Sequence, residues 1–66
     1  MRWIAEIKNP KPLHFVITQD SRAGFYLYVY ENGRVIYDDL QDTLEWAETV
    51  AFEKYQVPLG AWTQVD

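Results

Sequence analysis

Apolar and polar positions alternate most regularly along residues 24–31, where phenylalanine, leucine and valine are interleaved with three tyrosines. A period of two is typical of a β-strand, whose successive side chains point to opposite faces of a sheet. Asn32 and Gly33 follow, and this dipeptide favours a two-residue hairpin turn, in which both central residues need positive φ angles. Residues 34–38 are therefore predicted to form the returning strand of a β-hairpin.

The turn also predicts which side chains share a face, because directly opposed residues of an antiparallel pair lie on the same side. Pairing Glu31 with Arg34 gives one face made of Phe25, Leu27, Val29 and Ile36. The opposite face is then made of Tyr26, Tyr28, Tyr30, Val35 and Tyr37. We expect the first face to be the core and the second to be an amphipathic, tyrosine-rich surface.

Two strands are expected before the hairpin, over residues 2–8 and 13–18, separated by prolines that interrupt regular pairing. A helix is predicted over residues 43–55, with Asp42 as its N-cap and Glu45 completing a capping box. At 100° per residue its apolar stripe consists of Leu44, Ala47, Ala51 and Tyr55. Residues 59–65 are interpreted either as a short edge strand or as a segment laid over the helix flank.

These elements predict an α+β fold: a three- to four-stranded antiparallel sheet with one helix packed on one face, in the order β-β-β-β-α. The chain has 66 residues, of which 48% are apolar and 17% aromatic, so we expect a single small domain over residues 1–66. Its eleven aromatic rings (three Trp, five Tyr and three Phe) supply the large side chains that so short a domain needs for stability.

Composition excludes several classes of protein. The absence of cysteine excludes a disulfide scaffold and cysteine-based metal or haem sites, and no cofactor is expected. A net charge of −4 argues against a nucleic-acid binder that depends on phosphate neutralisation. No apolar run approaches the ~20 residues of a membrane span, so we expect no membrane partner and a cytoplasmic protein.

Candidate catalytic groups are sparse, and we expect the protein not to be an enzyme. The single histidine, His14, lies in a predicted strand without a recognisable second ligand or orienting residue. The single serine, Ser21, lies in a loop that lacks the glycine-framed turn of hydrolase nucleophiles.

Carboxylates are concentrated at the junction between the last hairpin strand and the helix: Asp38, Asp39, Asp42, Glu45 and Glu48. Acidic groups at a helix N-terminus are favoured by the helix dipole. The alternative is a divalent metal site built from Asp38, Asp39, Asp42 and Glu45. Residues 1–34 carry five basic and three acidic residues, a net charge of +2, and residues 35–66 carry one basic and seven acidic residues, a net charge of −6. This separation of charge favours a basic partner at the helix end of the chain, or it reflects only the ordinary acidity of a soluble protein.

The tyrosine-rich face carries the functional prediction. Tyrosine is enriched at protein interfaces because its ring is apolar and its tip is polar. We expect Tyr26, Tyr28, Tyr30, Val35 and Tyr37 to contact a protein partner or a second copy in a homodimer. Cover by the chain's own termini is the second interpretation. A stacking platform for single-stranded nucleic acid is the third, but it needs a basic groove.

Three segments carry a resemblance to a known family: Phe15-Val16-Ile17-Thr18-Gln19-Asp20, Gly24-Phe25-Tyr26-Leu27-Tyr28-Val29 and Asp42-Thr43-Leu44-Glu45-Trp46-Ala47-Glu48. Together they resemble the strand–strand–strand–helix core of HicB-type antitoxins, over residues 14–55. The chain is also similar to small bacterial proteins that pair a Tyr-x-Tyr hairpin with a Thr-Leu-Glu-x-Ala helix. The resemblance implies a bacterial partner-binding domain, with an acidic antitoxin-like or immunity-like inhibitor as an alternative function. This chain has no counterpart of the DNA-binding module of HicB-type antitoxins, and it has Asn32-Gly33 where that family has a Pro-Gly segment.

Overall fold

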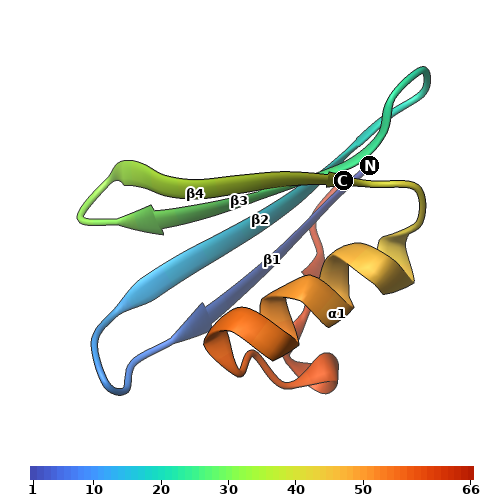
Figure 1. The fold of residues 1–66 in the computed structure, drawn as a ribbon. Helices are drawn as coiled ribbons and strands as arrows, with labels where there is room; N and C mark the ends of the chain where they lie inside the picture. Colours follow the sequence, from blue (N-terminus) through green and yellow to red (C-terminus); the bar gives the residue numbers. More distant parts are fainter.

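The computed structural model describes residues 1–66, which form one sheet with a single longer helix on one side (Figure 1). The strands are β1 Arg2–Ile7, β2 Leu13–Asp20, β3 Gly24–Glu31, β4 Arg34–Gln41 and β5 Thr63–Gln64. They form a five-stranded sheet in the order β4-β3-β2-β1-β5, in which every neighbouring pair is antiparallel. The predicted α+β class is confirmed, with one strand more than the largest number expected.

The hairpin of β3 and β4 is confirmed at its turn. Asn32 and Gly33 have φ angles of 52° and 77°, as the two central residues of the predicted turn require. Glu31 pairs with Arg34 on either side of them.

A β-bulge changes the register one residue after this turn. Tyr30 pairs with Val35 as predicted, but Val29 then pairs with Tyr37, so that Ile36 is an extra residue in β4. The predicted pairing of Val29 with Ile36 is therefore wrong. Because side chains alternate every residue, one inserted residue moves the rest of β4 to the face opposite to that expected.

The helix α1 spans Leu44–Tyr55, and its N-cap is Thr43 rather than the predicted Asp42. The Trp46 N–H donates to Thr43 Oγ1 at 3.1 Å. The difference arises because β4 continues to Gln41, three residues beyond its predicted end, so that Asp42 still belongs to the connection. The N-cap is thus one residue later than predicted, and the predicted capping box with Glu45 is wrong, because the third helical position is then Trp46.

The core lies between α1 and the sheet, and the predicted apolar stripe of the helix is confirmed. Ala47 and Ala51 are fully buried, while Leu44 and Tyr55 pack at the margin of the core. The nine buried side chains are all apolar: Ala5, Leu13, Phe15, Ile17, Leu27, Val29, Ala47, Ala51 and Val57. Small helical residues over large strand residues let the helix approach the sheet closely.

The C-terminal segment forms the predicted short edge strand. A 3₁₀ turn, η1 (Leu59–Ala61), leads into β5, which pairs with the outer edge of β1. Between them Trp62 packs edge-on against Phe15, with ring centroids 6.4 Å apart. The two termini lie side by side, where the Arg2 N–H donates to the Asp66 carbonyl at 3.0 Å (Figure 1). No helix in this fold combines the length and the apolarity needed to cross a membrane.

Candidate functional site

The sheet side opposite α1 has no layer of structure over it (Figure 1). The register places three cross-strand rows of side chains there. We call this surface the uncovered face and define it by Arg2, Ile4, Glu6, His14, Val16, Thr18, Tyr26, Tyr28, Tyr30, Val35, Asp38, Leu40 and Thr63. The C-terminal segment extends the sheet at β1 instead of crossing this surface, so the termini do not cover the tyrosines.

Three of the five predicted contact residues, Tyr26, Tyr28 and Tyr30, lie together on β3 in the middle of this face. All three are partly exposed. The rings of Tyr26 and Tyr28 stack on each other with centroids 5.9 Å apart and planes 19° apart. This stacking holds two rings in a fixed orientation and keeps a broad aromatic surface open to solvent.

Val35 also lies on the uncovered face, opposite Tyr30, and is 48% exposed. Two further side chains of the face that the sequence analysis did not single out are similarly open, Ile4 at 41% and Leu40 at 43%. The signal for Ile4 was present in the sequence, since Ile4 alternates along β1 with Trp3, Ala5 and Ile7, which pack in or against the core. Leu40 was missed because β4 was expected to end before it.

The predicted placement of Tyr37 is wrong. The bulge turns Tyr37 toward the helix, where it contacts the Tyr55 ring at 6.1 Å between centroids and lies under the Lys54 ammonium at 4.9 Å. Burial there raises the pKa of the Tyr37 phenol, and the nearby Asp39 carboxylate raises it further. Tyr37 therefore belongs to the covered side of the sheet.

A hollow of about 450 Å³ opens over β1 and β2 on the uncovered face, and its lining includes Ile4, Val16 and Thr63. His14 and Glu6 also line it, with His14 Nδ1 3.1 Å from Glu6 Oε2. Both side chains are more than two-fifths exposed. β5 pairs with Trp3 and Ile4 only, so the outer edge of β1 beside this hollow is open beyond that point.

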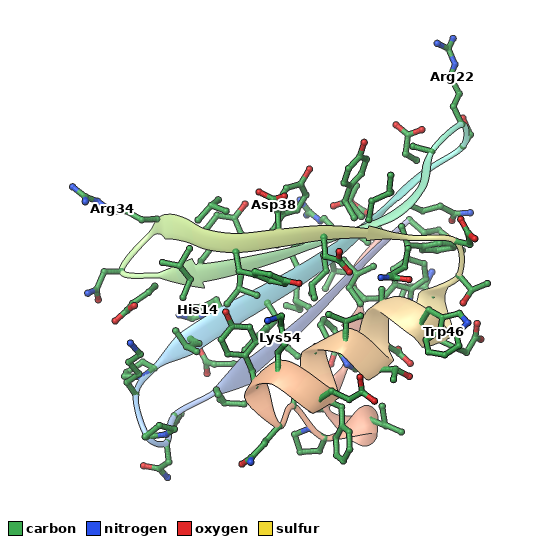
Figure 2. The ribbon with its side chains drawn as sticks, in the orientation of Figure 1. His14, Arg22, Arg34, Asp38, Trp46 and Lys54 are labelled. Atoms are coloured by element: carbon green, nitrogen blue, oxygen red, sulfur yellow. The ribbon has the colours of Figure 1, made fainter.

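The acidic residues at the strand–helix junction are spread over different surfaces. Asp38 lies on the uncovered face (Figure 2), whereas the next residue, Asp39, points to the covered side and accepts a hydrogen bond from Gln41 Nε2 at 2.7 Å. No group of three or more carboxylate or histidine side chains is arranged to hold a metal ion. On α1, partial burial raises the pKa of Glu48, and the neighbouring Glu45 raises it further.

Comparison of the chain with protein-family models, with curated proteins and with solved structures found no match. The resemblance to HicB-type antitoxins stays a prediction from the residues quoted above. The argument for function therefore rests on the uncovered face itself.

Proposed function

We propose that this chain is a small, non-enzymatic, cytoplasmic protein-binding module whose binding surface is the uncovered face. The observation that carries the proposal is that exposed apolar side chains and three tyrosines lie together on one sheet face that no other element covers. Trp46, Phe52 and Leu59 are also exposed, but they lie on α1 and η1. Val35, Leu40 and Ile4 are each more than two-fifths exposed and surround the three tyrosines of β3. Monomeric proteins rarely leave a contiguous apolar surface of several hundred Å² in water.

The chemistry of the face fits contact with protein better than contact with nucleic acid. Tyrosine contributes a large rigid ring and a hydroxyl that keeps its hydrogen bond when water is excluded. The only arginine of the uncovered face is Arg2, and its side chain lies 3.7 Å from the Asp66 carboxylate. A face with one paired cation lacks the basic groove that single-stranded nucleic acid requires.

Site-specific photocrosslinking in the cells that produce the protein tests this function. A benzophenone amino acid replaces Tyr28 at the centre of the face, and in a matched variant it replaces Trp46, which is 59% exposed on the helix side (Figure 2). We expect a discrete crosslinked protein species from position 28 and none from position 46. Crosslinking to another protein or to a second copy supports the function equally. The proposal fails if position 28 gives no protein product while both variants are folded and equally abundant.

A further inference from the structure

The two halves of the uncovered face differ in relief. The half formed by β1 and β2 contains the hollow of about 450 Å³ lined by Ile4, His14 and Val16. The half formed by β3 and β4 carries the stacked Tyr26 and Tyr28 rings and the exposed side chain of Val35. A surface that is hollow on one half and raised on the other is complementary to itself after a two-fold rotation.

The charges of the face are divided in the same way. Arg2, Glu6 and His14 lie on β1 and β2, and Glu6 and His14 are already paired with each other. On β3 and β4 the face carries a single charge, the carboxylate of Asp38. A rotation that places β4 over β4 would bring two Asp38 carboxylates together. A rotation that places β4 over β1 instead keeps the two Asp38 carboxylates apart, on opposite sides of the axis, and leaves Arg2 paired with Asp66 at 3.7 Å.

We propose that the occupant of the uncovered face is a second copy of this chain, packed sheet against sheet about a two-fold axis parallel to the strands. This inference rests on the proposed function and names the partner. In this arrangement β4 of each copy lies over β1 of the other, and β3 lies over β2. Tyr28, Tyr30 and Val35 of each copy then enter the hollow of the other, and the Tyr30 hydroxyl comes close to the His14–Glu6 pair. The dimer has two sheets inside and two helices outside.

The area of the face is sufficient for such a dimer. The four strands that overlap in this arrangement, β4 to β1, are spaced ~4.8 Å apart and have six to eight residues each, so they span roughly 19 by 20–26 Å. Two copies that meet over these strands bury roughly 800–1,000 Å² in total, which is near the lower limit for a specific interface. The same contact removes the exposed apolar side chains of both copies from water.

The free edge of the sheet is a poorer surface for self-association. Two copies of β4 could pair antiparallel over Tyr37–Gln41, with the uncovered faces of both sheets on the same side. The register of greatest overlap then places Asp39 of one copy opposite Asp39 of the other. A shift to the next matching register places Asp38 opposite Asp38 in one direction and Leu40 opposite Leu40 in the other, and in the second case the paired segment is shorter. Like charges directly opposite each other destabilise a strand pair, and the bulge at Ile36 twists the edge away from regular pairing.

Analytical ultracentrifugation of the purified wild-type chain, at protein concentrations from about 1 µM to about 1 mM, tests for the dimer. This concentration range covers the dissociation constants expected of an interface of this size. We expect a reversible shift from 7.8 kDa to twice that mass. Two variants, Tyr28→Glu and Val35→Glu (the second at a more exposed position), are expected to weaken the dimer about a hundredfold, because each adds a carboxylate to an interface that already contains Asp38. The control Trp46→Glu is expected to change it less than about twofold.

A wild-type chain that stays at 7.8 kDa over the whole range overturns the inference. A dimer that survives both face variants, with circular dichroism showing them folded, overturns it as well. Neither result contradicts the proposed function if the benzophenone at position 28 captures another protein in cells. Failure of the inference and failure of the proposed function are therefore distinguishable.

The direction of the two-fold axis has its own test, because the chain contains no natural cysteine. Two variants, Ile4→Cys and Asp38→Cys, are mixed and treated with a short bis-maleimide. We expect a mixed product that joins position 4 of one copy to position 38 of the other, and little self-product of Asp38→Cys. Dominant joining of position 38 to position 38 overturns the proposed orientation.

Discussion

The two faces of the sheet are made by alternate residues of the same strands, yet they have different surroundings. On β2, Phe15 and Ile17 are fully buried beneath α1 and the C-terminal segment, whereas Val16 between them is only partly buried on the uncovered face. On β3, Leu27 and Val29 are fully buried and the tyrosines between them are partly exposed. Strand alternation has thus produced two surfaces rich in apolar atoms, but the chain has only one helix with which to cover them.

The residue types on the covered and uncovered faces suit the different surroundings of the two faces. The buried side chains of the covered face carry no polar atoms that would need a partner. The uncovered face uses tyrosine, whose hydroxyl is hydrated in the free chain and can bond to a partner in a complex. Such a face is tolerable in water and still offers a large apolar area, which is why we assign stability to one face and binding to the other.

The largest test of this division compares adjacent residues on the two faces of β2. Phe15 is fully buried against the rings of Tyr55 and Trp62, so Phe15→Ala is expected to cost about 3–5 kcal/mol. A domain of 66 residues is expected to have only about 3–10 kcal/mol of stability, so this variant should be largely unfolded. Chemical denaturation followed by circular dichroism measures both quantities.

Val16→Ala is the matched control on the other face. Because Val16 is partly exposed, its loss is expected to cost about 1 kcal/mol or less at low protein concentration. If the two variants were equally destabilised, the uncovered face would be a second structural core, and the division between the faces would be wrong.

The sequence predicted most of this division, because both of its signals are local. The period of two along β3 separated Leu27 and Val29 from the tyrosines, and the helical period placed Ala47 and Ala51 against the sheet. Asn32-Gly33 then determined the first pairs of the hairpin. In each case the side chains that form the pattern are neighbours in the chain.

The prediction that was wrong concerns the register of β4, because the contacts that determine this register are not local in the sequence. Nothing in Val35-Ile36-Tyr37 distinguishes a bulged strand from a regular one, since all three residues suit either face of a sheet. The bulge is recognised only when Tyr37 meets Tyr55 and Lys54 of the helix, which are distant in the sequence. The candidate site therefore lost Tyr37 and gained Leu40, while the placement of Tyr26, Tyr28 and Tyr30 on one face was predicted correctly.

A smaller effect is expected where the helix meets the sheet. Ala51 is fully buried and allows close approach, so Ala51→Leu is expected to cost about 1–3 kcal/mol through overpacking. Glu53→Leu introduces the same side chain on the exposed side of α1 and is expected to change stability by about 0.5 kcal/mol or less. Equal effects in thermal denaturation of the two variants would mean that α1 is not packed tightly on the covered face.

The smallest expected effect appears only at alkaline pH and tests the corrected position of Tyr37. Burial raises the pKa of this phenol above its ordinary value of 10.0, with further contributions from Asp39, Tyr55 and Asp38. A pKa that is higher in the folded chain than in the unfolded chain gives stability that is complete below pH 10 and is lost as the pH rises through the folded value. Tyr37→Phe removes this loss, so its denaturation midpoint should fall less steeply above pH 10 than that of the wild type. Tyr28→Phe retains Tyr37 and, at a protein concentration that keeps the chain monomeric, should follow the wild-type slope. If Tyr28→Phe alone flattened the profile, the phenol shielded from water would be the one at position 28, and the assignment of these two tyrosines to opposite faces would have to be reversed.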